Sequence, residues 1–341
     1  MPCYHPLKGW QIGFHESGKP KYKITSYDVK YLIKSDNNQF IPCYDSIDND
    51  ILRPRILDFI EIPCGHCIGC RLKYSTDWAA RCLLELKYSD CASFITLTYD
   101  NEHLPKPNEI IDSNGVITTS PVNPLVKRDL QLFFKRVRKK FPDKKIRYFA
   151  AGEYSPNGRP HYHIILFNLD FTHDRKLWKC QNGFMYYVSE DLKKLWPFGF
   201  HIITDVNFET CAYTARYVVK KMKGQESYVY DLYSFPSEFS LASRRPGIGR
   251  VYYDENKKDI YDDLKIQLTN GKIVHPPRYY DKLFDIEYPE EMKKIKEDRR
   301  IKAIDFEKMK SSLTTLSYLD RLAVEEENLN EKLKACIRKE L

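Results

Sequence analysis

Two histidines separated by one residue, His161 and His163, lie in the apolar run Arg159–Phe167 (RPHYHIILF). The run is rich in β-branched and aromatic residues, which predicts a buried strand. Side chains at positions i and i+2 of a strand point to the same face, about 6.6 Å apart along the backbone. Two imidazoles held in this way can bind one metal ion. On the pair alone, a chance pair of half-buried histidines remains the alternative.

A carboxylate near the histidines would extend such a site. The sequence predicts strands at Ile146–Ala151 and His161–Phe167 that form a hairpin, and Glu153 then lies on the neighbouring strand. Two histidines and one carboxylate, with open positions left over, suit Mg²⁺ or Mn²⁺ that must also hold a phosphate oxygen. The alternative is a Glu153 that caps a strand or faces solvent.

Two tyrosines four residues apart, Tyr213 and Tyr217, lie in the predicted helix Glu209–Lys223 and share one of its faces. Lys220 and Lys221 lie on or next to that face. A tyrosine hydroxyl is a poor nucleophile at neutral pH, but a nearby lysine favours the phenolate and neutralises a scissile phosphate. Two such tyrosines can alternate, one holding a DNA 5′ phosphate while the other attacks. The alternative is an aromatic stripe packed in the core, with a solvated lysine pair.

Three cysteines spaced three apart lie in the motif PCGHCIGCR, namely Cys64, Cys67 and Cys70. CxxC spacing lets two thiolates reach one tetrahedral Zn²⁺, and three thiolates need a fourth ligand. We take Cys3 as that ligand, with Cys43 and His66 as the other candidates. Reduced thiols packed as small apolar groups and an iron–sulfur site are the alternatives to a structural zinc.

Mixed helices and strands, with the two middle strands forming a hairpin, favour an α+β fold with an antiparallel sheet. We expect an irregular cysteine-containing region over residues 1–74, a main domain over 75–284 and a charged helical tail over 285–341. Short strands are predicted at Lys21–Thr25 and Val29–Ile33. The main domain is predicted to contain helices at Ser75–Tyr88, Val126–Phe141 and Ser189–Trp196, and strands at Ala92–Tyr99 and Gly199–Val206.

Composition excludes few classes of protein. Lys and Arg exceed Asp and Glu by 8, which permits nucleic-acid binding without demanding it. The 25 tyrosines suit base stacking, and they equally suit A+T-rich codon usage. No apolar run approaches the roughly 18 residues of a membrane helix, and the N-terminus lacks the pattern of a signal peptide. We therefore expect a protein of the reducing cytoplasm with no membrane partner and no disulfide framework.

Basic residues cluster in two places. Arg244, Arg245 and Arg250 are expected to form a flexible loop that holds single-stranded DNA, with Tyr252 and Tyr253 stacking on bases. The basic helical run 135–140 (KRVRKK) either contacts phosphates or forms a solvated face. The tail mixes both signs of charge, which favours a solvated helical hairpin or a partner-binding helix.

Taken in order, the strand ITLTY, then GEY, then the His-x-His strand, then YxxxYxxKK resemble the HUH endonuclease superfamily. Two tyrosines separated by three residues resemble the rolling-circle initiators of small single-stranded DNA phages. The motifs PCGHCIGCR, WAARC, SRRPGIGR and PPRYYDK closely resemble the replication initiators of gokushoviruses, a microvirus group. The resemblance runs from about Pro63 to Lys282.

The resemblance implies a core of the RRM or ferredoxin-like kind, in which Ile95–Tyr99 matches a central strand. It implies metal binding by His161 and His163 and a nucleophile role for Tyr213 and Tyr217. The residue between the histidines, Tyr162, departs from the aliphatic residue common in such motifs. The third metal ligand varies in the superfamily, so two acidic residues after the first strand compete with Glu153, and these are Asp100 and Glu102.

The resemblance also implies a function. The protein would nick one strand of the double-stranded replicative form at its origin, with a tyrosine taking the 5′ phosphate and the free 3′ hydroxyl priming a host polymerase. A second cleavage would close the displaced strand into a circle, with Mg²⁺ or Mn²⁺ as cofactor, in the host bacterial cytoplasm. The sequence has no GxxxxGK[ST] pattern, so a host helicase would be needed. The rival readings are a relaxase or transposase of the same superfamily, and a non-catalytic, zinc-stabilised DNA-binding protein.

Overall fold

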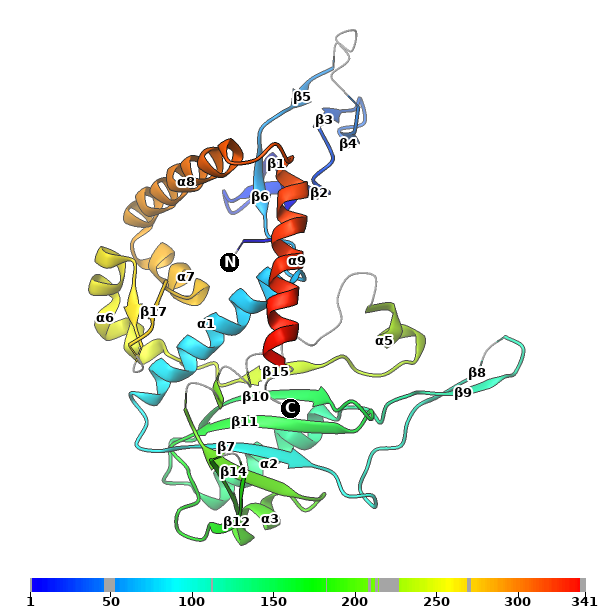
Figure 1. Cartoon of the computed structure of the whole chain (residues 1–341), viewed down its shortest axis with the longest axis vertical. Helices are drawn as coiled ribbons and strands as arrows, with labels where there is room; N and C mark the ends of the chain where they lie inside the picture. Colours follow the sequence, from blue (N-terminus) through cyan, green and yellow to red (C-terminus); the bar gives the residue numbers. More distant parts are fainter. Residues whose placement is uncertain are drawn as a thin grey trace. The chain divides into compact units, whose positions relative to one another are not determined.

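The computed structural model describes residues 2–45, 53–111, 113–181, 183–207, 210–211, 214, 227–268 and 271–337 (Figure 1). The chain divides into two compact units, one of residues 74–300 and one of residues 1–73 with 301–341. The domain boundaries expected after residues 74 and 284 stay a prediction. The two compact units differ from the three expected regions, because residues 301–341 group with the N-terminal residues. Among the described helices, none has the length and apolarity needed to cross a membrane.

The larger unit contains a seven-stranded sheet in the order β12-β13-β14-β7-β11-β10-β15, and every neighbouring pair is antiparallel (Figure 1). The strands are β7 (Ala92–Thr98), β10 (Arg147–Tyr154), β11 (Pro160–Phe167), β12 (Lys176–Gln181), β13 (Phe184–Val188), β14 (His201–Asp205) and β15 (Phe239–Ala242). Two separate hairpins pair β8 (Glu109–Ile111) with β9 (Ile117–Thr119), and β16 (Ile266–Gln267) with β17 (Ile273–Val274). The predicted α+β class with an antiparallel sheet is confirmed.

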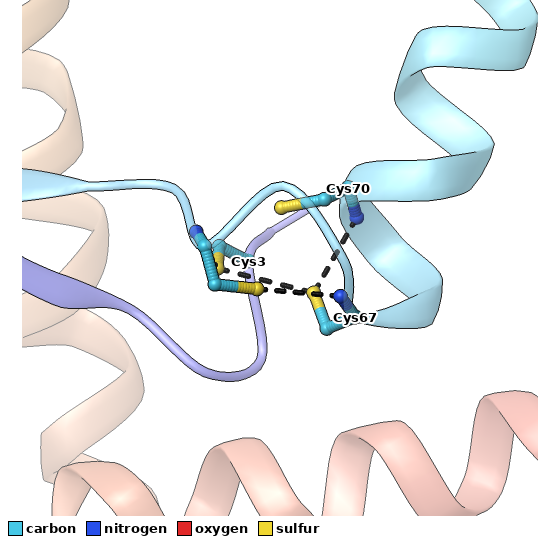
Figure 2. Close-up of side chains that lie close together, drawn as sticks. Cys3, Cys67 and Cys70 are labelled. Carbon is cyan, nitrogen blue, oxygen red and sulfur yellow. Dashed lines mark hydrogen bonds between the residues drawn. The ribbon is translucent and has the colours of Figure 1, made fainter. Parts of the chain in front are cut away.

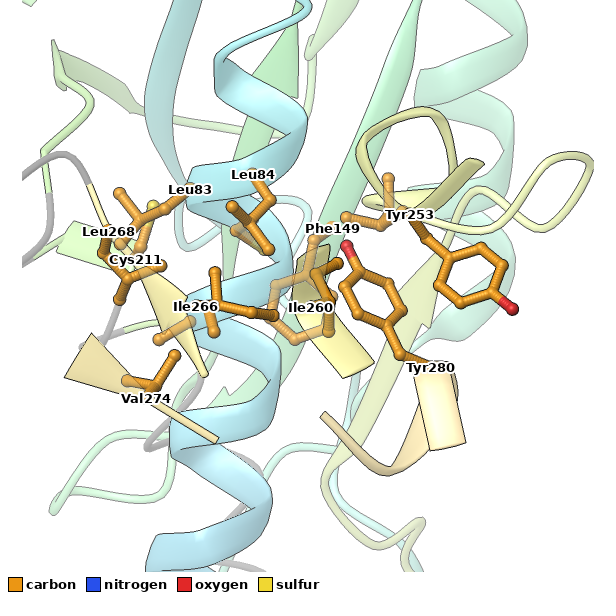
Figure 3. Close-up of a cluster of buried hydrophobic side chains, with 14 of the residues drawn as sticks. Leu83, Leu84, Phe149, Cys211, Tyr253, Ile260, Ile266, Leu268, Val274 and Tyr280 are labelled. Carbon is orange, nitrogen blue, oxygen red and sulfur yellow. The ribbon is translucent and has the colours of Figure 1, made fainter. Parts of the chain in front are cut away.

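Helices pack on both faces of this sheet because successive strand residues point to opposite sides. The helices are α1 (Ile68–Leu86), α2 (Lys127–Lys140), α3 (Glu190–Leu195), α5 (Tyr228–Leu232), α6 (Arg250–Asp263), α7 (Arg278–Glu287) and α8 (Pro289–Ser312). On one face, Tyr162 and Ile164 of β11 pack with α2 and α3. On the other face, Ile165 and Phe167 pack with α1, α6 and α7. Figure 3 shows this cluster, with Phe149 of β10 near Leu84 of α1 and Ile260 of α6. The two histidines of β11 alternate with Tyr162 and therefore share this second face.

The smaller unit contains two three-stranded antiparallel sheets, ordered β2-β1-β6 and β4-β3-β5. Their strands are β1 (Leu7–Phe14), β2 (Pro20–Thr25), β3 (Tyr31–Lys34), β4 (Phe40–Cys43), β5 (Arg55–Ile56) and β6 (Phe59–Ile62), and helix α9 spans Tyr318–Ile337. A small core of Trp10, Val29 and Leu32 holds the strands together. The expectation of an irregular region was wrong for β1, whose glycines hide its strand pattern, whereas the two predicted short strands are confirmed as β2 and β3.

Helix α1 begins seven residues before the predicted start at Ser75. Ser75, the predicted first residue, is buried within the helix. Gly69 and Cys70 are tolerated because they occupy the first turn, where backbone N–H groups have no partner within the helix. The other predicted elements between residues 92 and 206 are confirmed to within a few residues. The predicted helix Glu209–Lys223 lies almost wholly outside the described residues.

The segment Ser243–Arg250 is clamped, which contradicts the expectation of a flexible loop. Arg147 donates to the carbonyl oxygen of Gly247 at 3.1 Å and forms a buried ion pair with Glu85. The same Glu85 carboxylate accepts the N–H of Gly249 at 2.7 Å. A buried ion pair with additional backbone hydrogen bonds fixes the loop because breaking any partner leaves a charge without compensation.

Two other segments hold the same loop. Arg81 of α1 donates to the carbonyl oxygen of Ile248 at 3.0 Å, and its guanidinium lies between the rings of Trp78 and Tyr279, at 4.1 and 4.0 Å from their centroids. Tyr280 of α7 donates its hydroxyl to the carbonyl of the glycine that follows Ile248, at 2.6 Å. The sequence motifs WAARC, SRRPGIGR and PPRYYDK therefore meet at one place.

Replacement of Gly249 by alanine should test this clamp. Gly249 has φ +75°, and an added Cβ would meet the hydroxyl of Tyr280 at 2.8 Å. Gly115 has φ +79° with nothing within 4 Å, so Gly115→Ala measures the backbone cost alone. We expect Gly115→Ala to lower the free energy of unfolding by about 1–2 kcal/mol, and Gly249→Ala to lower it by about 1–3 kcal/mol more, in urea titrations. Equal losses for the two variants would contradict the clamp.

Candidate metal centre and basic groove

The hairpin of β10 and β11 brings the three predicted metal ligands together. Glu153 lies directly opposite His161 in the antiparallel register, and His163 lies two residues along the same strand. Side chains directly opposite one another in an antiparallel pair are on the same face of the sheet. Glu153, His161 and His163 each place one ligand atom within 4.8 Å of the others.

Both imidazoles point one nitrogen at the same carboxylate oxygen. Glu153 Oε1 lies 2.5 Å from His161 Nε2 and 3.3 Å from His163 Nε2. The opposite ring nitrogens have partners of their own, with His163 Nδ1 3.1 Å from Thr96 Oγ1 and His161 Nδ1 3.4 Å from the carbonyl oxygen of Arg159. Contacts of this kind orient histidine ligands and leave the other nitrogen to bind a metal.

The candidate metal centre is largely buried. Glu153 is 3% exposed and His163 is 5% exposed, and the ring of Phe94 stacks on His163 with a centroid distance of 5.7 Å. The side chain of His161 is 15% exposed, which makes it the most accessible of the three. Burial opposes ionisation of Glu153, but hydrogen bonds to the two histidines outweigh it and lower the carboxyl pKa to about 2. This carboxylate is therefore ionised at neutral pH.

The competing acidic residues have other positions. Asp100 is exposed and accepts hydrogen bonds from the backbone and the ring of His103, both at 2.8 Å. Glu102 is exposed as well. The geometry thus favours Glu153 as the third ligand. Thr96 was not identified from the sequence as a contact of His163. Its position in the strand beside the histidine strand could have indicated this contact.

The four residues predicted for the nucleophilic step, Tyr213, Tyr217, Lys220 and Lys221, lie outside the described residues. Their described neighbours Cys211 and Thr214 are fully buried. Cys211 belongs to the apolar cluster on the sheet face that also carries the histidines (Figure 3). The roles of the two tyrosines and two lysines stay a prediction.

A basic groove, of about 710 Å³, lies between α2, the start of β10 and the edge strand β15. Among the described residues that line it, all the charged side chains are basic, and these are Lys127, Arg138, Lys145, Arg147, Arg244 and Arg245. Arg147 is neutralised by Glu85, whereas the other five are exposed. The guanidinium of Arg138 lies 5.5 Å from the ring of Tyr148, which gives the groove an aromatic wall. Such a surface suits a polyanion with stacking groups.

Only part of the predicted DNA-binding set lines the groove. Arg244 and Arg245 do, whereas Arg250 opens α6 and pairs with Asp254 at 2.7 Å and Glu287 at 3.1 Å. The expectation that Tyr253 stacks on bases was wrong, because its side chain is fully buried.

Residues of the basic run 135–140 have two different roles. Arg138 lines the groove. Arg136 donates to the carbonyl oxygen of Leu195 at 2.8 Å, and Lys140 pairs with Asp191 at 2.6 Å, so these two fasten α3 to α2.

The four cysteines predicted to bind zinc gather in the smaller unit, and Figure 2 labels three of them, Cys3, Cys67 and Cys70. Cys3, Cys64, Cys67 and Cys70 place their sulfur atoms within 4.8 Å of one another. The two other candidates for the fourth ligand are not part of this cluster. Cys43 is in β4, and the ring of His66 directs Nδ1 at the carbonyl oxygen of Cys64, 3.0 Å away. Burial opposes ionisation of Cys67, but backbone N–H groups donate to its sulfur and lower the thiol pKa to about 7.

Replacement of Glu153 by glutamine should weaken Mn²⁺ binding. The neutral amide keeps the shape of the side chain but removes the carboxylate that Glu153 contributes to the cluster. We expect calorimetry to show at least a tenfold loss of Mn²⁺ affinity. Removal of a residue that only orients a metal ligand already causes a loss of that size. Asp100→Asn removes the competing carboxylate and should leave the affinity within about twofold. The reverse ranking would assign the third ligand to Asp100.

Comparison with known proteins gives consistent results. Residues 92–222 match the family described as replication-associated protein ORF2/G2P. The chain is 31% identical over 319 residues to replication-associated protein ORF2 of Spiroplasma virus 4, covering 91% of this chain and 93% of that protein. It is 26% identical to replication-associated protein VP4 of Bdellovibrio phage phiMH2K, covering 91% and 86%. It is 29% identical over 252 residues to replication-associated protein ORF4 of Chlamydia phage 1, covering 68% and 58%. No solved structure matches.

Proposed function

Because this chain belongs to the family of replication-associated proteins of microvirus-type phages, we propose that it initiates rolling-circle replication by nicking the origin of the double-stranded replicative form. The observation that carries the proposal is the convergence of Glu153, His161 and His163 on one face of the sheet. Residues 92–222, which match the family, include these three residues and both predicted nucleophiles.

The donor set fits a hard divalent ion. Two imidazole nitrogens and one ionised carboxylate oxygen leave coordination positions for water and for a phosphate oxygen, as Mg²⁺ and Mn²⁺ require. When bound, such an ion would polarise the scissile phosphate and offset the charge that develops on it. His161 is the most exposed of the three ligands, so a DNA phosphate would approach from its side.

The strand order supports an HUH-type core. The elements β7, α2, β10, β11, α3 and β14 follow one another along the chain, with β12 and β13 inserted, and the sheet order of their strands is β14-β7-β11-β10. This is the arrangement of a ferredoxin-like unit, in which both helices cover one face of the sheet. Here α2 and α3 cover the face opposite the histidines, so the metal-binding face is free of them.

The proposed reaction exchanges one phosphoester for another. The phenol of Tyr213 or Tyr217 releases its proton to solvent, and the phenolate oxygen attacks phosphorus. The bond from phosphorus to the DNA 3′ oxygen breaks, and that oxygen takes up a proton from solvent to become a 3′ hydroxyl. The positive charges of Lys220 and Lys221 stabilise the phenolate and neutralise the phosphate that it attacks. The phosphotyrosine retains the bond energy, so no nucleotide is hydrolysed.

The two tyrosines give the reaction its second half. The 3′ hydroxyl primes a host polymerase, which regenerates the origin while a host helicase separates the strands. The free tyrosine then cleaves the regenerated origin. The 3′ hydroxyl released by this cleavage attacks the first phosphotyrosine, which frees that tyrosine and closes the displaced strand into a circle. The chain would thus act as a site-specific DNA endonuclease with strand-joining activity in the host bacterial cytoplasm.

The nucleophile assignment predicts a covalent adduct. Wild-type protein with Mn²⁺ and single-stranded origin DNA should form a species that survives a denaturing gel. Tyr213→Phe with Tyr217→Phe should abolish it, because no phenol remains at either position. Each single variant should retain adduct formation at the remaining tyrosine, and mass spectrometry of the DNA-linked peptide should identify that residue.

The same assay separates the rival functions. A wild-type protein that binds the DNA but forms no adduct would contradict nicking and favour a non-catalytic DNA-binding protein. An adduct that persists in the double variant would show that the tyrosine assignment is wrong. An adduct formed on transfer-origin or element-end hairpins, in place of phage origin DNA, would indicate a relaxase or a transposase.

The basic groove is proposed to hold the DNA backbone, and its salt dependence tests this. Arg138 lines the groove and the adjacent Lys139 does not, so these two exposed side chains form a matched pair on α2. Arg138→Ala, and Arg244→Ala with Arg245→Ala, should lower the slope of log affinity against log salt by about 0.7–0.9 per cation removed. Lys139→Ala should leave the slope almost unchanged. An equal effect of Arg138→Ala and Lys139→Ala would mean that the groove is not the DNA surface.

A further inference from the structure

Four sulfur atoms form a compact cluster in the smaller unit, between the N-terminal segment and the start of α1 (Figure 2). Cys3 Sγ and Cys67 Sγ are 3.9 Å apart, and all four sulfurs lie within 4.8 Å of one another. A tetrahedral zinc with bonds near 2.3 Å requires sulfur atoms roughly 3.8 Å apart. A disulfide requires about 2.05 Å, so the observed spacing suits a shared ion better than a bond between sulfurs.

Backbone N–H groups donate to each of the four sulfur atoms. Cys64 N donates to Cys3 Sγ at 3.2 Å, and Cys67 N donates to Cys64 Sγ at 3.3 Å. Tyr4 N and Cys70 N donate to Cys67 Sγ at 3.3 and 3.5 Å. The sulfur of Cys70 receives a backbone hydrogen bond from the glycine that follows Cys64. Thiols are weak acceptors, whereas donors aimed at sulfur stabilise thiolates, as in a metal-binding loop.

Two glycines make this backbone path feasible. Gly65 has φ +78°, a left-handed conformation that lets the chain turn between Cys64 and Cys67. At Gly69, an added Cβ would lie 2.1 Å from the carbonyl oxygen of Pro2, so only glycine lets the N-terminal segment approach α1 this closely. The sequence therefore provides both the sulfurs and the backbone conformation that gathers them.

We propose that Cys3, Cys64, Cys67 and Cys70 bind one structural zinc ion as four thiolates. Four thiolates this close repel one another strongly unless a cation lies between them. The ion would join the third residue of the chain to a loop about sixty residues later. It would thereby stabilise a unit whose apolar cores are small. This site is separate from the histidine site and does not rest on the proposed nicking activity.

Metal analysis of the full-length chain tests the proposal. Protein purified under reducing conditions should contain one zinc per chain by mass spectrometry, and a mercurial reagent should release it. To keep the histidine site from contributing, the measurement is repeated in the variant His161→Ala with His163→Ala, which should retain the zinc. Folded, reduced protein with less than about 0.2 zinc per chain would overturn the proposal, as would iron in its place.

Matched cysteine variants test the ligand set. Cys3 and Cys43 each lie between a proline and a tyrosine, but only Cys3 is in the cluster. Cys3→Ser should abolish stoichiometric zinc, whereas Cys43→Ser should retain it. If Cys3→Ser does not fold, cobalt substitution of the wild type tests whether four thiolates bind the ion. Strong sulfur-to-cobalt absorption with the intensity of a tetrahedral four-thiolate site is expected, and its absence would contradict the proposal.

Discussion

The register between β10 and β11 is the constraint on which the candidate site depends. A slip of one residue would turn the side chains of β11 to the opposite face and separate the histidines from Glu153. The tight turn after β10 holds the register, since Ser155 N donates to the carbonyl oxygen of Arg159 at 2.9 Å. Neighbouring strands pair with both members of the hairpin, so the register is also fixed by β15 and β7.

A second constraint fixes the sheet against its helices. The Glu85–Arg147 ion pair, the stacked guanidinium of Arg81 and the hydroxyl of Tyr280 all converge on one short loop. The loop cations Arg244 and Arg245 remain exposed on the groove, while the carbonyl groups beyond them are held inside. The loop thus combines rigid support on one side with a basic surface on the other.

Local patterns in the sequence predicted much of this arrangement. Alternation and β-branching predicted β7, β10, β11 and β14 of the main sheet but not β12, β13 or β15. The predicted hairpin also indicated that Glu153 faces the histidines. The sequence did not reveal that the loop around Gly247 is clamped or that Tyr253 is buried, because both depend on contacts between residues far apart in the chain. The start of α1 was missed because its first turn carries glycine and cysteine, which are weak helix formers. Tyr213 and Tyr217 lie outside the described residues, so their assignment rests on sequence alone.

The central claim is that both histidines bind one divalent ion. Its most direct measurement is pulsed electron paramagnetic resonance of bound Mn²⁺ in protein whose histidines are labelled with nitrogen-15. The account predicts hyperfine coupling to two directly bound imidazole nitrogens, and to one after replacement of either His161 or His163 by alanine. A bound Mn²⁺ without nitrogen-15 coupling would contradict the account.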